Sequence, residues 1–347
     1  IGHEKRPSGT FRKILSRLRR HVRADVAMDL GTSSTLIYVR SEGIVLHEPS
    51  LIAVDTLTNK VVGLGKSAQR FQDREPGHVR IVHPLSSGAI ADFNAAVAMI
   101  RGFFAKVLGK RVPSRLRLVV AIPAGLTQVE RKAVREAVYE AGCRTVFLLN
   151  GVMATAMGSG VDVEKPPASM VLNVGGGTTE AAVINMGSVM HSESVRIAGN
   201  DMDEAIVRYL QRNFHLRISH RLGEKIKVRV GCAVSVEDQQ SVTLTAQEIG
   251  VGAIRTGMVS SSQVSEALSA PVDAILDTVR RALENVPPAL LADVRDRGIM
   301  LSGGGCLLKG LDELITRMTG IDTVRVPDPF VSVILGCGLA VEELDRW

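Results

Sequence analysis

The chain has 347 residues, of which 45% are hydrophobic and 22% charged, enough to bury the cores of two domains. No uninterrupted apolar run approaches the ~20 residues of a membrane-spanning helix, and no secretory signal peptide is visible. The four cysteines lie far apart and lack the paired spacing of a zinc site, so we expect reduced thiols in a cytoplasmic protein.

The basic charge of the chain is concentrated at its beginning. The whole chain carries a net charge of +6, while residues 1–24 hold eight basic residues against Glu4 alone, so the rest is close to neutral. Aromatic residues make up only 3% of the chain, so basic and aromatic side chains do not alternate as they do in proteins that bind single strands. Nucleic acid is therefore not an expected partner.

Residues 1–24 predict a basic amphipathic helix. At ~100° per residue, one arc of about 100° is apolar and the remaining arc is mostly cationic. The apolar residues are Phe11, Ile14, Leu15 and Leu18, and the basic ones are Arg12, Lys13, Arg17, Arg19 and Arg20. Such a helix binds an anionic membrane surface, with ~1 kcal/mol from each basic residue near the headgroups. The alternatives are a helix packed on its own domain and a partly disordered basic leader.

The first element after this segment is a strand that ends in a polar turn. The sequence from Asp29 to Val39, DLGTSSTLIYV, predicts a strand, a tight turn of Gly31, Thr32, Ser33 and Ser34, and a second strand. Glycine lets backbone N–H groups converge on an anion, and the hydroxyl groups beside it add further hydrogen bonds. This turn is therefore a candidate phosphate-binding loop.

The middle of the chain alternates strands with helices. Residues 115–125 predict a buried strand, residues 126–142 an amphipathic helix that stops at Gly142, and residues 145–160 a further strand that leads into a helix. This alternation is typical of an α/β fold.

A second glycine-rich hairpin follows and aligns with the first. The sequence from Asn173 to Val183, NVGGGTTEAAV, again predicts a strand, a turn of Gly175, Gly176, Gly177 and Thr178, and a second strand. One such hairpin is weak evidence, but two matching copies indicate two related domains with phosphate loops that face each other across a cleft.

Helices and one more glycine turn complete the chain. Helical stretches are expected at residues 201–216, 224–227 and 271–287. Residues 295–311 predict a strand, a turn of Gly303, Gly304 and Gly305, and the start of a helix. Because glycine permits close approach of a ligand to the backbone, this third turn, together with Ser302 before it, is a candidate contact for a phosphate or a nucleoside.

These blocks together resemble the MreB family of bacterial actins, within the superfamily of actin, sugar kinases and heat-shock chaperone ATPases. The similarity runs from about residue 25 to the end and includes DLGTSSTLIYV, VAIPAGLTQVERKAV, NVGGGTTEAAVI, GNDMDEAI and DRGIMLSGGGCLLKGL. It implies an actin-like (ribonuclease H-like) α/β fold with two related domains around a nucleotide cleft. Domain I would comprise residues 25–165 and 325–347, and domain II residues 166–324 with a shortened outer part.

The resemblance also implies a set of ligand contacts. ATP or ADP with Mg²⁺ would lie between the two phosphate loops, and Asp29 would hold the metal through water. The residues that fall where family members contact ribose and base are Glu224, Lys225, Ile226 and Lys227, together with Gly303, Gly304, Gly305, Cys306 and Leu307. For Asp29 the alternative is a turn carboxylate, and for Glu224 and Lys227 it is a solvated helical ion pair.

Two positions depart from the family pattern and concern hydrolysis. Asn173 stands where the family usually has an aspartate, and Asn150, Gly151 and Val152 stand where it usually has two glutamates and a proline. The missing carboxylates are those that orient the attacking water and organise the metal. Losing such a group typically costs ~10²–10⁴ in rate, so we expect nucleotide binding with weak or absent ATPase activity.

Three functions are compatible with these observations. The first is an MreB-like protein that binds ATP and forms protofilaments on the inner face of the cell membrane, together with rod-complex proteins or another MreB. The second is a non-polymerising, hydrolysis-deficient module that regulates another filament at the membrane. The third, a phosphotransferase, lacks a separate acidic base in a sugar-sized pocket.

Overall fold

The computed structural model describes residues 23–72, 77–109, 112–234 and 240–345. The amphipathic segment expected at residues 1–24 therefore lies almost entirely outside the described residues. Within them, no helix combines the length and the hydropathy needed to cross a bilayer.

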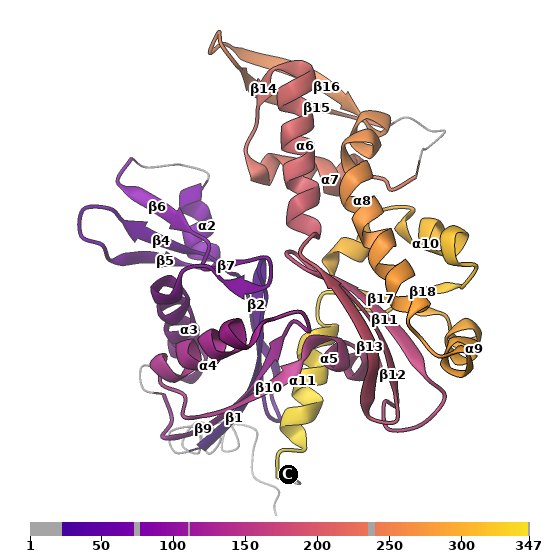
Figure 1. The fold of residues 1–347 in the computed structure, drawn as a ribbon. Coiled ribbons are helices and arrows are strands. Elements are labelled where there is room, and N and C mark those ends of the chain that lie inside the picture. Colours follow the sequence, from indigo (N-terminus) through magenta and orange to yellow (C-terminus); the bar gives the residue numbers. More distant parts are fainter. Residues whose placement is uncertain (1–22, 73–76, 110–111, 235–239, 346–347) are drawn as a thin grey trace, which may run out of the picture.

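The two large sheets of the molecule have the same plan (Figure 1). In each, an antiparallel three-stranded meander continues into two strands parallel to its first strand. The first sheet contains β1 (Arg23–Leu30), β2 (Ser34–Val39), β3 (Gly43–Pro49), β9 (Arg115–Ile122) and β10 (Thr145–Asn150). The second contains β11 (Ser169–Val174), β12 (Thr179–Asn185), β13 (Ser188–Val195), β17 (Ile299–Ser302) and β18 (Thr323–Arg325). The duplication found in the hairpins therefore extends to whole sheets.

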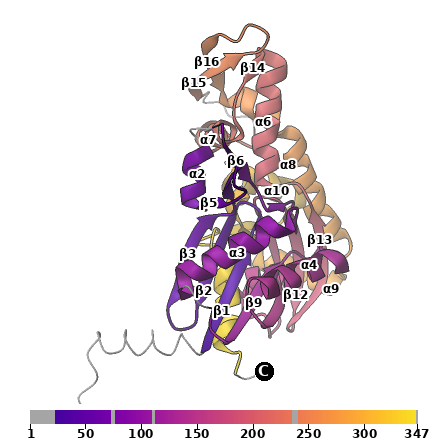
Figure 2. The same cartoon turned by 90° about the vertical axis from the view of Figure 1, so that its left-hand side faces the viewer.

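Helices cover both faces of the first sheet (Figure 1 and Figure 2). One face packs against α3 (Phe93–Leu108) and α4 (Gln128–Glu140), with Phe103 and Phe104 fully buried between them and the strands. The other face packs against α5 (Gly151–Gly158) and α11 (Ser332–Glu342). Because α11 is the last helix, the end of the chain returns to the first sheet.

The second sheet is arranged in a similar way. One face packs against α6 (Gly199–Phe214), α8 (Ser261–Glu284) and α10 (Leu311–Thr319). Helix α9 (Pro288–Arg297) joins the same core through Val294. The other face packs against Val152 and Ala156 of α5. Ala154 of the same helix packs on the first sheet, so α5 lies between the two sheets. Its first residue, Gly151, lines the cavity.

Smaller elements extend each half of the molecule. Beside the first sheet lie β4 (Ile52–Asp55), β5 (Val61–Leu64), β6 (Val79–Val82), α2 (Lys66–Gln72), β7 (Leu85–Ser86) and β8 (Ala89–Ile90). Beyond the second sheet lie α7 (His220–Val230) and a three-stranded sheet of β14 (Leu216–Arg217), β15 (Ser241–Glu248) and β16 (Ile254–Ser260). In Figure 1, β4, β5, β6 and α2 lie at the outer end of the first half, and β14, β15 and β16 lie at the outer end of the second.

Helix α8 differs from the prediction made from the sequence. The sequence predicts a helix over residues 271–287, which begins at Pro271, and proline is common in the first turn of a helix. In the structure the helix begins ten residues earlier and contains Pro271. Ser260 caps this earlier start: its Oγ accepts a hydrogen bond from Gln263 N at 3.3 Å, and Gln263 Oε1 accepts one from Ser260 N at 2.9 Å. The reciprocal cap was the signal that the sequence analysis missed.

Candidate nucleotide-binding site between the two domains

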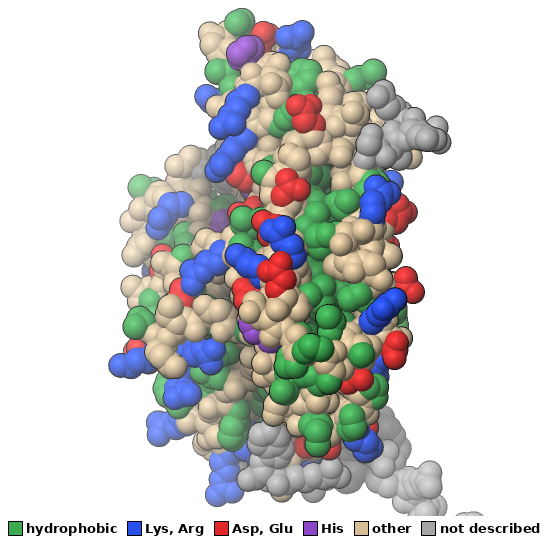
Figure 3. Space-filling model, turned by 45° about the vertical axis from the view of Figure 1, so that its right-hand side comes forward, with side chains coloured by type: hydrophobic (Ala, Val, Ile, Leu, Met, Phe, Trp, Pro, Cys, Tyr) green, Lys and Arg blue, Asp and Glu red, His purple; other side chains and the backbone are tan. Residues whose placement is uncertain are grey.

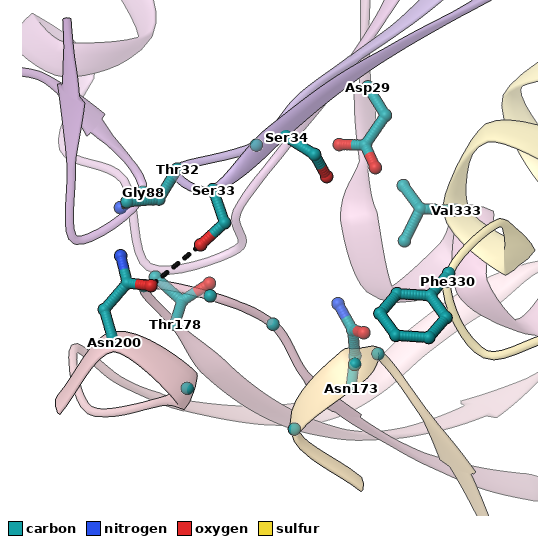
Figure 4. Close-up of a pocket in the computed structure, with 18 of the residues that line it drawn as sticks. Asp29, Thr32, Ser33, Ser34, Gly88, Asn173, Thr178, Asn200, Phe330 and Val333 are labelled. Atoms are coloured by element: carbon teal, nitrogen blue, oxygen red, sulfur yellow. Dashed lines mark hydrogen bonds between the residues drawn. The ribbon is translucent and has the colours of Figure 1, made fainter. Parts of the chain in front are cut away.

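Two polar loops from different sheets line one cavity (Figure 4). The loop between β1 and β2 contributes Gly31, Thr32, Ser33 and Ser34, and the loop between β11 and β12 contributes Gly175, Gly176, Gly177 and Thr178. Each loop closes with the same backbone hydrogen bond, from Gly31 N to Ser34 O at 3.1 Å and from Gly175 N to Thr178 O at 2.9 Å. The structure thus brings both predicted phosphate loops together.

The strands that carry these loops place polar side chains differently. In the first hairpin Asp29 pairs across the strands with Leu36, whereas in the second Asn173 pairs with Glu180. Directly paired residues share one face of a sheet. These faces point toward each other and toward α5, so Asp29, Asn173 and Glu180 all reach the cavity, whereas Leu36 is buried in the core.

The two loops touch across the cavity. A side chain at Gly177 would collide with Thr32, so only glycine permits this approach. Ser33 Oγ donates a hydrogen bond to Asn200 Oδ1 at 2.8 Å, and Gly88 N donates to Thr32 Oγ1 at 2.9 Å. Figure 4 shows the first of these bonds spanning the cavity.

The N-terminus of α6 is tied to the second loop. Gly199 N donates to Gly175 O at 3.1 Å, and Asn200 N donates to Gly176 O at 2.8 Å. Lys227 Nζ in turn donates to Gly199 O at 2.8 Å and pairs with Asp203 Oδ1 at 2.8 Å. These contacts use the N–H groups of Gly199 and Asn200 and pair the ammonium group of Lys227, so they fix α6 and α7 against the second loop.

Glu180 is a buried carboxylate that reaches across the domain boundary. It comes from β12, and its Oε1 accepts a hydrogen bond from Ala124 N of the loop after β9 at 2.5 Å. Its Oε2 lies 3.5 Å from the point where a side chain at Gly151 would begin. Burial raises the pKa of Glu180 to about 7, the hydrogen bond from Ala124 lowers it, and the nearby charge of Asp29 raises it.

Asp29 is a second carboxylate that lines the cavity, and burial raises its pKa to about 7 as well. Among the described residues, no group of three or more His, Cys, Asp or Glu side chains forms a metal cage. Mg²⁺ is usually bound by one or two carboxylates, waters and substrate phosphates. Asp29, in a cavity lined by two glycine-rich loops, fits that pattern.

The residues that depart from the family pattern also line this part of the site or border it. Asn150 caps α5, because its Oδ1 accepts a hydrogen bond from Val152 N at 3.0 Å. Gly151 follows it and lines the cavity without a side chain. The cap gives Asn150 a structural role and leaves position 151 open.

The outer part of the cavity is formed by α7 and the third glycine turn. Glu224, Lys227, Gly303, Gly304 and Gly305 line it, as the sequence predicted. The other four predicted contacts, Lys225, Ile226, Cys306 and Leu307, are not among the lining residues, and Ile226 and Cys306 are buried in the core of the second half. The helical period explains this for α7, where positions 224 and 227 share a face and 225 and 226 do not.

Sequence reasoning missed several residues that line the cavity, including Gly88, Glu180, Asn200, Asp203 and Phe330. The sequence did contain a signal for Glu180, because it is the one charged residue in the strand TEAAVIN. Phe330 had no such signal, since its position beside Gly304 depends on how the chain returns to the first sheet.

Comparison with known proteins agrees with this geometry. Residues 23–347 match the family model described as MreB/Mbl protein. The chain is 39% identical over 338 residues to the cell shape-determining protein MreB of Escherichia coli K12, covering 96% of this chain and 97% of that protein. It is 36% identical over 322 residues to the cell shape-determining protein Mbl of Bacillus subtilis, covering 93% and 97%.

Solved structures give the same answer. MreB5 of Spiroplasma citri bound to ADP matches with a TM-score of 0.87 and 29% identity, covering 94% of this chain and 99% of that one. The same protein bound to AMPPNP matches with a TM-score of 0.88 and 30% identity, covering 93% and 97%. A MamK double helical filament, at 20% identity, shares the fold with a TM-score of 0.78 and covers 93% and 99%. The chain therefore belongs to the MreB/Mbl family of actin-like, cell shape-determining proteins.

Proposed function

We propose that this chain binds ATP or ADP with Mg²⁺ between its two domains and forms or joins membrane-associated filaments that organise cell shape and cell-wall synthesis. The observation that carries the proposal is the pair of matching phosphate loops, one from each sheet, in contact across a single cavity. MreB5 of Spiroplasma citri, which has the same fold, binds ADP and AMPPNP.

The cavity offers different groups to the different parts of a nucleotide. The backbone N–H groups and hydroxyls of the two loops suit the phosphates, with the N-terminus of α6 adding a favourable dipole. Glu224 offers an acceptor for ribose hydroxyls, while Gly303, Gly304 and Gly305 allow a sugar and base to approach the backbone. Asp29 would hold Mg²⁺ through water.

Hydrolysis should be slow in this chain. Asn173 keeps the shape and hydrogen-bonding reach of an aspartate but carries no charge, and Gly151 offers no side chain at all. Each lost carboxylate is of the kind that orients water or organises a metal, so turnover should fall by ~10²–10⁴ while binding persists.

Self-association and membrane attachment complete the proposal. Hydrophobic side chains gather on the face of the molecule shown in Figure 3, where acidic and basic side chains are interspersed. Large exposed apolar residues of the second half include Met186, Met190, Ile254, Met258 and Val324. Filament formation is proposed from the family resemblance to filament-forming relatives and does not rest on these residues, which lie on several different segments. Membrane attachment depends on the basic residues and apolar arc of the first 24 residues.

The first test is equilibrium binding of Mg²⁺-ATP together with phosphate release. The comparison is between the wild-type chain and the double substitution Asn173→Asp with Gly151→Glu. We expect tight binding by both and a ~10²–10⁴-fold faster release by the double variant. Release by the wild type at the rate of the double variant would contradict slow hydrolysis, and failure of both to bind ATP would contradict the site itself.

A second test separates the polymerising protein from a non-polymerising module. The full chain is mixed with anionic or neutral lipid vesicles in the presence of Mg²⁺-ATP, pelleted, and viewed by electron microscopy. Filaments on anionic vesicles support the proposal. A soluble monomer that binds these vesicles without filaments would favour the regulatory module instead.

A further inference from the structure

Four carboxylates line the cavity, and their surroundings differ. Asp203 is paired with Lys227 at 2.8 Å, so its charge is compensated. Glu224 lies on the exposed side of α7, at the outer part of the cavity. Asp29 and Glu180 remain on the inner wall beside the phosphate loops, and Asp29 is the residue suited to Mg²⁺. Glu180 is therefore the inner carboxylate without an assigned role.

The position of Glu180 compensates for the departure at Gly151. Its Oε2 is 3.5 Å from the place where a side chain at position 151 would begin, so its carboxyl group borders the space that a glutamate at 151 would enter. It also directly opposes Asn173 across the β11–β12 pair, two residues after Thr178 of the phosphate loop. A carboxylate thus stands beside both positions where the usual acidic residues are missing.

The other oxygen of the same carboxyl group is anchored by the opposite domain. Ala124 N, in the loop that follows β9, donates to Oε1 at 2.5 Å. This bond requires the two sheets to be close, as does the ion pair of Arg196 with Glu130 at 2.6 Å. The bond from Ala124 thus fixes one oxygen of the carboxyl group, while the other, Oε2, borders position 151.

We infer that Glu180 is the catalytic carboxylate of this chain, which orients the attacking water and accepts its proton in the slow hydrolysis of ATP. In this step a lone pair of the water oxygen forms a bond to the γ-phosphorus. The bond between that phosphorus and the β–γ bridging oxygen breaks, and its electron pair leaves with ADP. The proton from water passes to Glu180 and then to the released phosphate. The inference rests on the proposed function, because it needs ATP in the cavity.

Glu180→Gln is the decisive substitution. Glutamine keeps the volume of glutamate and an oxygen that can accept the hydrogen bond from Ala124 N, but it cannot accept a proton at neutral pH. Two quantities are measured in the full chain, the dissociation constant of Mg²⁺-ATP and the single-turnover rate of phosphate release. We expect release to fall at least ~100-fold while the dissociation constant changes less than about threefold.

Two further variants make the test specific. Gly151→Glu combined with Glu180→Gln returns a carboxylate to the same space from α5, so it should recover at least ~10-fold of the lost rate. Glu193→Gln is the matched control, because Glu193 lies on the neighbouring strand β13 and is not among the residues that line the cavity. Its release rate should equal that of the wild type.

Each remaining outcome counts against the inference. Release by Glu180→Gln within about threefold of the wild type would show that another group handles the water. A loss of ATP affinity greater than ~10-fold in Glu180→Gln would make Glu180 a binding or structural residue. Wild-type chain that binds ATP but releases no phosphate would overturn the inference and leave the nucleotide site intact, whereas wild-type chain that does not bind ATP would overturn the proposed function.

Discussion

The β1–β2 and β11–β12 hairpins share the same backbone arrangement but carry different polar side chains. Both connect a buried strand to an antiparallel partner through a turn closed by the same backbone hydrogen bond, and they occupy equivalent places in their sheets. The first has an acid on its leading strand opposite a leucine, Asp29 with Leu36. The second has an amide opposite an acid, Asn173 with Glu180. The backbone thus provides two matching glycine-rich loops, while the cross-strand pair determines which carboxylate side chains line the cavity.

The largest effect should come from separating the two loops. Gly177→Val would place a branched side chain against Thr32 of the opposite loop, so the loops could no longer touch. We expect ATP affinity to fall more than ~100-fold, measured by calorimetry or by fluorescence of a labelled nucleotide. Gly77→Val is the control, because no atom lies within 4 Å of a side chain added there. ATP affinity of Gly177→Val within threefold of the wild type would show that contact between the loops is unnecessary.

The acid of the second hairpin should make stability depend on pH. The pKa of Glu180 rises from 4.5 to about 7 on folding. Below pH 4.5 it is protonated in both states; between these values only the unfolded chain loses the proton, so stability falls as pH rises, and above pH 7 the loss is constant. At ~1.4 kcal/mol per unit this amounts to about 3 kcal/mol.

Urea unfolding without nucleotide or Mg²⁺ measures this effect. The unfolding free energy of the wild type minus that of Glu180→Gln should decrease by about 3 kcal/mol between pH 4.5 and pH 8. A flat difference for Glu180→Gln would mean that the carboxyl group ionises as readily in the folded protein as in the unfolded chain.

Exchanging acid and amide on the leading strands should shift metal dependence in opposite directions. Asp29→Asn removes the carboxylate suited to Mg²⁺, so the ratio of ATP affinities with Mg²⁺ and with EDTA should fall ~10-fold. Asn173→Asp adds a second such carboxylate, so the ratio should rise. Asp201→Asn is a control on α6, where this carboxylate accepts a hydrogen bond from Ala198 N outside the cavity lining. Equal ratios in all three variants would remove Asp29 from the metal site.

Much of this comparison could be predicted from the sequence. Alternating strands and helices, two aligned hairpins and the glycine turn at residues 303–305 predicted an α/β protein with two related halves and the places of its turns, because turn chemistry is local. The actin-like fold and the return of the chain end to the first half came from the family resemblance. The family resemblance supplied the contacts at Glu224 and Lys227, which both line the cavity.

The remaining features were missed for two reasons, one tertiary and one local. Aligning the hairpins matched Glu180 with a leucine, so its role emerged only when α5 and the loop after β9 were placed beside it. Asn150 stands at one of the positions where the family pattern differs, and in the structure its carboxamide caps α5. Pro271 looked like the start of a helix, but it lies inside α8 because a reciprocal cap at Ser260 sets the true start. A contact between distant segments explains only the position of Glu180, whereas the caps formed by Asn150 and Ser260 are local to their own helices.

The smallest effect should come from removing the hydrogen bond between Ser33 and Asn200, which joins the two halves of the molecule. Ser33 Oγ donates to Asn200 Oδ1 at 2.8 Å across the cavity, and both side chains are solvent-accessible, so the bond should contribute only ~0.5–1 kcal/mol to the closed arrangement that binds ATP. Ser33→Ala and Asn200→Ala should each weaken ATP binding about two- to fivefold. The double variant should bind no more weakly than the worse single one, because either substitution already removes the whole bond. Ser188→Ala, at the exposed start of β13, controls for the loss of a hydroxyl. Additive losses would mean that the two residues act on the nucleotide independently. The contacts between the two halves would then be the Arg196–Glu130 ion pair and the Glu180–Ala124 hydrogen bond, and not the bond between Ser33 and Asn200.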